Sequence, residues 1–276
     1  MMYFIIDNNQ LTYFNELFKE FSGIQIILPL PVYAEIVLRR NPKKSMEALQ
    51  GHDLLFGMQI GDILSGIRDR SEKEICSFEP FLSMNTKEYA RYLQSIFAEP
   101  TNEIISLARH IKDSNLLFCS RMRNNAVNFR KIKRDRKSSG AFKDKDRFDK
   151  MRDALESAPS FLEELIYNLI TQEGKKKCTI SSKAGLKDAV MSNPYLSRLF
   201  RSMLCYVFSI SRMWTNQKYN YDPEEGRDDL TDILLPTYAC DGDIIVTDDR
   251  KLKQHIKLLE PTGVVKGLSV HELLDN

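Results

Sequence analysis

Several features that define other protein classes are missing from this sequence of 276 residues. No apolar run approaches the ~20 residues that a helix needs to cross a bilayer, so we expect no membrane span. The five cysteines are scattered and form no CxxC pair, which argues against a disulfide framework or a zinc site. The beginning, MMYFIIDNNQ, lacks the basic segment of a signal peptide. These absences predict a soluble, cytoplasmic protein with reduced thiols.

Motifs of several enzyme classes are absent as well. The sequence has no GxxxxGK[ST], no GxGxxG and no GxSxG, so nothing supports nucleotide hydrolysis or serine catalysis. The four histidines are isolated and form no HExxH or Cys/His cluster. The net charge of +2 excludes no class of partner, but the charge is unevenly distributed: acidic groups stand near both ends and a basic stretch lies in the middle.

The first 40 residues alternate between strand and helix patterns. Residues 2–7 are a short apolar run that ends in an acid, as a buried parallel strand does, and residues 24–28 are a second, β-branched strand. Residues 10–21 place leucine and phenylalanine at helical spacing, and residues 29–40 enter a helix through two prolines. This order of elements predicts an α/β fold.

The last 50 residues repeat this alternation. Pro236 is expected to bend or shorten the first helix here, because proline disrupts a helix interior. The predicted elements are a helix over 228–241, a strand over 243–247, a short helix over 249–256, a strand over 256–259 and a final helical turn. We expect the two ends to form one parallel sheet of about four or five strands with helices on both faces.

The middle of the chain is predicted to be a large all-helical insertion over residues 43–221. Helical patterns occupy 86–98, 101–112, 160–172 and 194–214. The predicted organisation is therefore a discontinuous core, residues 1–42 and 222–276, interrupted by this insertion.

Acidic residues stand where this core places strand ends and helix starts. The carboxyl ends of parallel strands share one edge, where open α/β sheets bind ligands, so we expect these carboxylates to converge. Any one aspartate also fits a helix cap or a turn, and Asp241 and Asp243 are interpreted as turn residues. The converging candidates are Asp7, Glu35, Asp229 or Asp232, and Asp248 or Asp249.

Converging carboxylates repel one another and need a cation to compensate them. Oxygen ligands suit Mg²⁺ or Mn²⁺. One or two such ions beside a phosphodiester polarise the phosphate and stabilise the leaving oxygen. The acidic residues therefore predict a hard-cation site for phosphodiester hydrolysis.

Three segments resemble the PIN-domain nucleases. YFIIDNNQL resembles the family's first strand with its leading aspartate, Asp7, and IILPLPVYAEIV resembles its second strand and the helix that carries a glutamate, Glu35. DDLTDILLPTYACDGDIIVTDDRKL resembles the closing motif, which supplies two further acids: Asp229 or Asp232, and Asp248 or Asp249. The chain departs from this usually compact family in the 193 residues that separate Glu35 from Asp229, and in an Asp where Asn is common before the third acid.

The resemblance implies Mg²⁺- or Mn²⁺-dependent hydrolysis of RNA that leaves a 5′-phosphate and a 3′-hydroxyl. It also implies a toxin- or defence-type nuclease with an inhibitory protein partner, and a homodimer. The alternatives are a structure-specific DNA nuclease, a non-catalytic nucleic-acid-binding or scaffold protein, and, with less support, a small-molecule phosphohydrolase. The implied metal ligands are Asp7, Glu35, Asp229 and Asp249.

A basic segment inside the insertion is the second candidate site. Residues 121–153 carry thirteen Lys and Arg residues against five Asp, a local charge of +8. We interpret this segment as an arm that binds the nucleic-acid backbone, RNA before DNA, with a solvated helix face as the alternative. The candidate contacts are Arg130, Lys131, Lys133, Arg134, Arg136 and Lys137.

Overall fold

The computed structural model describes most of the chain, and the described residues fall into two compact units. The described residues are 2–7, 10–11, 13, 24–134, 159–171, 182–213, 229–260 and 263–275. The first unit comprises Met1–Ile63, Glu79–Asn115 and Tyr238–Asn276, and the second comprises Leu64–Phe78 and Leu116–Thr237. The domain boundaries at residues 42 and 222 stay predictions.

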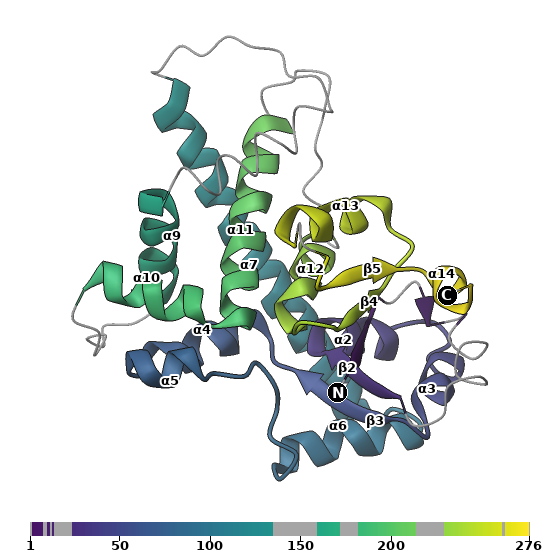
Figure 1. The fold of residues 1–276 in the computed structure, drawn as a ribbon. Helices are drawn as coiled ribbons and strands as arrows, with labels where there is room; N and C mark the ends of the chain where they lie inside the picture. The colour runs from purple at the N-terminus through teal and green to yellow at the C-terminus, as the bar shows by residue number, and fades with distance from the viewer. Residues whose placement is uncertain are drawn as a thin grey trace. The chain divides into compact units, whose positions relative to one another are not determined.

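The first unit is built on a parallel sheet of five strands (Figure 1). The strands are β1 (Tyr3–Ile6), β2 (Gln25–Pro29), β3 (Asp53–Gly57), β4 (Ile244–Val246) and β5 (Lys266–Leu268). Their order across the sheet is β3-β2-β1-β4-β5, and each neighbouring pair is parallel. In the central register Phe4 of β1 lies between Ile26 of β2 and Ile244 of β4. The predicted α/β class with a parallel sheet is confirmed.

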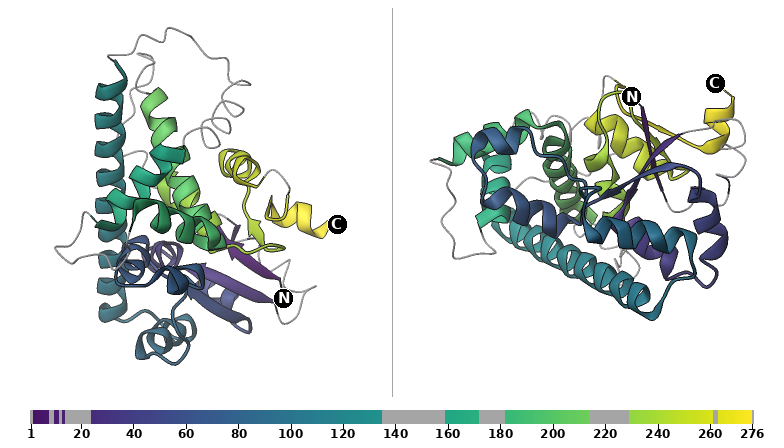
Figure 2. Two further views of the ribbon diagram at one scale, coloured as in Figure 1. Left: turned by 60° about the vertical axis from the view of Figure 1, so that its left-hand side comes forward. Right: turned by 90° about the horizontal axis from the view of Figure 1, so that it is seen from below.

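The core of this unit explains why the short apolar segments become strands. Ile5 and Ile6 of β1 and Ile26 of β2 are completely buried, as expected for a parallel sheet covered by helices. The helices that lie wholly in this unit flank the sheet (Figure 2). They are α2 (Leu30–Val37), α3 (Lys43–Leu49), α6 (Lys87–Phe97), α13 (Arg250–Leu259) and α14 (Val270–Leu274).

The second unit is helical in its described part. Its helices are α5 (Glu72–Cys76), α9 (Pro159–Thr171), α10 (Lys183–Ser192), α11 (Pro194–Met213) and α12 (Asp229–Leu234), and it receives the later parts of α4 (Ile60–Arg68) and α7 (Asn102–Arg134). Asn193, between α10 and α11, is buried and accepts a hydrogen bond from the Leu196 backbone N–H at 3.0 Å, which caps α11. Its amide nitrogen donates to the backbone carbonyls of Ile75, Cys76 and Phe78. One side chain thus joins the start of α11 to the last residues of α5 and to Phe78 just after it.

One stretch within the predicted all-helical insertion is a strand. Residues 53–57 form β3, where Leu54 pairs with Ile26 and Phe56 with Leu28 of β2. Both Leu54 and Phe56 are buried in this register. The all-helical prediction is therefore wrong for these residues. They pair with β2 and bury alternate side chains as an edge strand does, although the segments around them are helical.

The predicted strand over residues 256–259 is also wrong. These residues are the last turn of α13, whose buried side includes Leu252, Ile256 and Leu259 at helical spacing. The fifth strand comes later, as β5. The effect expected of Pro236 is confirmed, because α12 ends at Leu234 and a 3-10 turn, Leu235–Tyr238, follows it.

Two further features of the described residues complete the fold. None of the described helices combines the length and the apolar character of a membrane span. The described cysteines, Cys76, Cys119, Cys205 and Cys240, are free thiols, and burial raises the pKa of the Cys205 thiol to about 12. The predicted helix over residues 10–21 lies mostly outside the described part of the chain.

Candidate functional site

The sheet order creates a switch point between β1 and β4. From β1 the chain continues through β2 and β3 on one side, and later returns to place β4 and β5 on the other side. In open parallel sheets ligands bind beyond the carboxyl ends of the strands at such a point. The residues that directly follow these two strands are Asp7 after β1 and Thr247 after β4. The topology thus selects this pair from all the strand ends.

Asp7 is held tightly at this position. Its side chain is buried, with 2% of the residue exposed, and its backbone N–H donates to the carbonyl of Val246 at 3.0 Å. Its Oδ2 accepts a hydrogen bond from the Thr247 hydroxyl at 2.7 Å. A buried carboxylate is costly unless hydrogen bonds compensate the lost hydration, and Thr247 supplies such a bond.

Thr247 links Asp7 to a second carboxylate-bearing residue. The Thr247 side chain is fully buried, and its Oγ1 accepts a hydrogen bond from the backbone N–H of Asp249 at 3.0 Å. Asp249 is half-buried and caps α13, because its Oδ1 accepts from the Leu252 N–H at 3.1 Å. The preceding residue, Asp248, is exposed. Of the two predicted alternatives, Asp249 is therefore the one that a hydrogen-bonded bridge connects to Asp7.

Glu35 lies on α2, the helix that begins at the carboxyl end of β2. It is half-buried, whereas every other residue of α2 is buried. The helix is fixed by Tyr33, whose ring meets Phe56 and Tyr92 edge-on with centroids 5.8 and 5.0 Å away. The Tyr33 hydroxyl is also hydrogen-bonded to Ser95 Oγ at 2.5 Å. Glu35 is thus a single acidic residue on an otherwise apolar, rigidly packed helix.

The third predicted acid lies in the second unit. Asp229 and Asp232 are on α12, which packs against α11. Asp232 is half-buried, while the side chain of Asp229 is outside the described part. The convergence of either residue with Asp7 stays a prediction.

The basic segment falls largely outside the described residues. The first four candidates, Arg130, Lys131, Lys133 and Arg134, form the end of α7, and none of their side chains is described. The other two candidates, Arg136 and Lys137, lie outside the described residues. Their role in binding nucleic acid stays a prediction.

Asp243 has the structural role that the sequence suggested. It is buried at the amino end of β4, where its Oδ1 accepts from the Tyr3 backbone N–H at 2.9 Å and its Oδ2 from the Cys240 N–H at 2.6 Å. Asp241 in the same turn is exposed. Asp243 therefore holds the amino ends of β1 and β4 together, whereas Asp7 lies at the carboxyl ends of these strands.

The carboxylate groups are of the chemical type that binds a divalent cation, but the described side chains do not form a complete metal site. Carboxylate oxygens are the ligands that Mg²⁺ and Mn²⁺ prefer. Among the side chains that the structure describes, no group of three or more His, Cys, Asp or Glu is arranged to hold a metal ion. The described carboxylates therefore suit such an ion by their chemistry without forming a complete set of ligands.

Comparison with known proteins adds no relative from which a role could be transferred. No protein-family model, curated protein or solved structure matches this chain. A function can therefore be inferred only from the sequence motifs and from the arrangement of Asp7, Thr247 and Asp249 at the switch point of the sheet.

Proposed function

We propose that this protein is a divalent-metal-dependent nuclease of the PIN-like type that hydrolyses RNA. The observation that carries the proposal is the hydrogen-bonded bridge from buried Asp7 through Thr247 to Asp249. It lies beyond the carboxyl ends of β1 and β4, the position at which open parallel sheets bind ligands. A parallel sheet of five strands flanked by helices is compatible with a PIN-like core.

In this proposal each acidic residue has a defined task. Asp7 is the proposed central ligand, oriented by the Thr247 hydroxyl, and Asp249 and Glu35 are the proposed second and third ligands. By resemblance alone, the fourth ligand is Asp229 or Asp232. A bound Mg²⁺ or Mn²⁺ ion would polarise the scissile phosphate and stabilise the leaving oxygen. An inhibitory protein partner and a homodimer belong to the same proposal by resemblance alone.

The test compares two buried aspartates, one beyond the carboxyl ends and one at the amino ends of the central strands. Asp7→Asn keeps the shape of the side chain and its hydrogen bond to Thr247, so we expect a folded protein that no longer cleaves RNA. Asp243→Asn is the matched control, because it replaces a buried aspartate that accepts two backbone hydrogen bonds away from the site. In Asp243→Asn one carboxylate oxygen becomes an NH₂ group, which cannot accept a hydrogen bond from the backbone N–H that it faces. This loss lowers the free energy of unfolding by about 1–3 kcal/mol, but the folded variant should cleave RNA like the parent.

The assay uses labelled single-stranded RNA, single-stranded DNA and flapped duplex DNA in Mg²⁺, Mn²⁺ and EDTA. Cleavage of RNA that requires the metal and disappears in Asp7→Asn supports the proposal. Cleavage confined to flapped DNA supports a structure-specific DNA nuclease instead. Binding without turnover in any metal supports a non-catalytic nucleic-acid-binding protein. Equal cleavage by Asp7→Asn and the parent would show that the site is assigned wrongly.

A further inference from the structure

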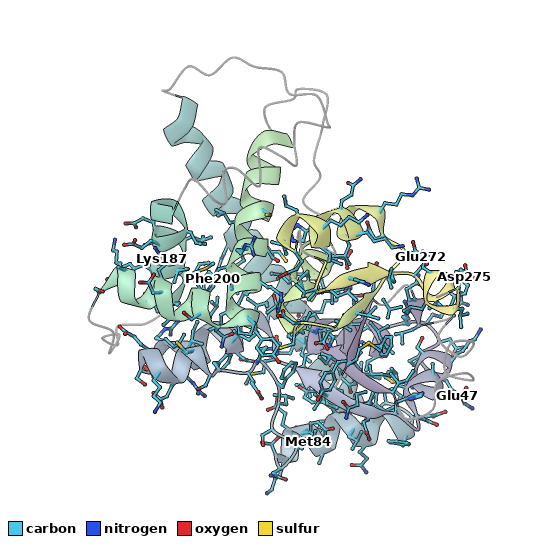
Figure 3. The ribbon with its side chains drawn as sticks, viewed as in Figure 1. Glu47, Met84, Lys187, Phe200, Glu272 and Asp275 are labelled. Atoms are coloured by element: carbon cyan, nitrogen blue, oxygen red, sulfur yellow. The ribbon has the colours of Figure 1, made fainter. Side chains whose placement is uncertain are left out.

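The helix that follows the candidate site carries positive charge on its exposed side. The sequence of α13, RKLKQHIKLL, has four Lys or Arg residues and no acidic residue. Arg250, Gln254 and Lys257 are exposed and recur at i, i+4 and i+7, so they form one stripe along the helix. In Figure 3 nitrogen-tipped side chains project from α13 on the side away from β5. The opposite side is buried through Leu252, His255, Ile256, Leu258 and Leu259.

Helix stability does not explain where this charge lies. Arg250 is the first residue of α13, and the first turn contains no acidic residue. The amino end of a helix is the positive end of its dipole, so a cation at that position opposes the dipole while an anion would favour it. Arg250 therefore does not stabilise α13 through the helix dipole, whereas the N-cap Asp249 supplies the favourable negative charge there.

The stripe starts at the candidate site and leads away from it. Asp249, the N-cap of α13, directly precedes Arg250. Lys257 lies seven residues further, about 10 Å along a helix that rises 1.5 Å per residue. That length corresponds to about three phosphates of a nucleic-acid strand at roughly 3.4 Å per nucleotide. Lys253 lies between them, but its ammonium group is bonded to Glu272 of α14, so Arg250 and Lys257 supply the charge for a partner.

We infer that the stripe of Arg250, Gln254 and Lys257 on α13 binds the phosphate backbone of a nucleic-acid strand and guides it to the carboxylates at the sheet edge. The inference rests on the proposed nuclease function. A site made of carboxylates repels a polyanion, and the cations of α13 offset this repulsion next to the site. Because the contacts are to the backbone, they do not select a sequence, and they weaken as salt rises.

The experiment measures binding in the Asp7→Asn background, which separates binding from cleavage. Labelled single-stranded RNA and DNA of one sequence are titrated over a range of salt concentrations. The test variant is Arg250→Glu with Lys257→Gln, in which the new glutamate favours the helix dipole and preserves the fold. The control is Lys87→Glu with Lys44→Gln, which makes the same change in charge. Lys87 is likewise the exposed first residue of a helix, α6, and Lys44 is exposed on α3.

The test variant is expected to bind roughly tenfold more weakly at about 0.1 M salt than the background protein. Its plot of log affinity against log salt should be shallower by about 1.4, since each lost phosphate contact removes about 0.7 for a single strand. The control should match the background in both quantities, and RNA and DNA should respond alike. Unchanged binding by the test variant, an equal loss in the control, or no binding by any form would overturn the inference.

Cleavage by the wild-type protein and by the same variants with Asp7 intact separates this inference from the proposed function. If the wild type cleaves no nucleic acid and the α13 variant alone loses binding, the nuclease proposal fails and the binding surface stands. If the wild type cleaves RNA and the α13 variant binds and cleaves like the control, the surface is wrong and the nuclease proposal stands.

Discussion

Replacing Thr247 by valine tests the bridge between Asp7 and Asp249 directly. Valine has nearly the shape of threonine, so the change removes two hydrogen bonds while creating little cavity. The lost bonds are the 2.7 Å bond donated to the Asp7 carboxylate and the 3.0 Å bond accepted from the Asp249 N–H. A hydrogen bond to a charged group contributes about 1.5–3 kcal/mol and one between neutral groups about 0.5–1.5 kcal/mol.

The expected loss is smaller than the sum of these two contributions. Thr247 is fully buried, so the valine methyl that replaces the hydroxyl gains about 0.8 kcal/mol of hydrophobic burial. We therefore expect Thr247→Val to lower the free energy of unfolding by roughly 2–3 kcal/mol. The measurement is urea unfolding followed by circular dichroism at neutral pH.

Thr247→Ser is the matched control, because it keeps the hydroxyl and loses one buried methyl group. It should cost about 1 kcal/mol through the small cavity alone. At a temperature where both variants are folded, the valine variant should cleave RNA at least roughly tenfold more slowly than the serine variant, because Asp7 is no longer oriented. Equal stability and equal cleavage of the two variants would refute the role of the bridge.

Two further predictions concern stability. Asn193→Ala should lower the free energy of unfolding by about 3–5 kcal/mol in urea unfolding, because it removes the cap of α11 and the amide that satisfies three backbone carbonyls. A loss below about 1 kcal/mol would contradict this reading. Bonds to Glu272, from Lys253 first and then from Ser269, lower the Glu272 pKa to about 2 from 4.5. The stability that the ionised Glu272 contributes is therefore present above about pH 4.5 and is lost as the pH falls toward 2. In thermal unfolding measured over this pH range, the melting temperature of Glu272→Gln should change less with pH than that of the wild type.

The predictable part of the fold is the part in which local pattern and tertiary burial agree. The runs that became β1, β2 and β4 are apolar because both faces of a central parallel strand are covered. The edge strands lack this signal. β5 is only Lys266–Leu268 and none of its residues is fully buried, so its position is set by pairing with β4 rather than by its own sequence. β3 buries Leu54 and Phe56, but this alternation is only five residues long and stands between helical segments.

The candidate site shows the same division. Topology alone places the residue after β1 beside the residues after β4, so the neighbourhood of Asp7 was predictable from the order of strands. The choice between Asp248 and Asp249 was not, because both follow the same strand. It depends on backbone geometry: Asp249 turns its N–H to Thr247 and its carboxylate to the first turn of α13. The threefold bonding of the Asn193 amide likewise has no local signature, since its partners lie more than one hundred residues away.

The pairing of β1 with β4 has a consequence for the synthesis of the protein. Asp7 and Thr247 are 240 residues apart in the chain. At about 5–20 residues per second, a ribosome needs roughly 12–50 s between making one and making the other. Throughout that time β1 has no neighbour on its β4 side, and the bridge cannot form. Any activity that depends on the bridge is thus withheld from a growing chain until Thr247 has been added and β4 can pair with β1.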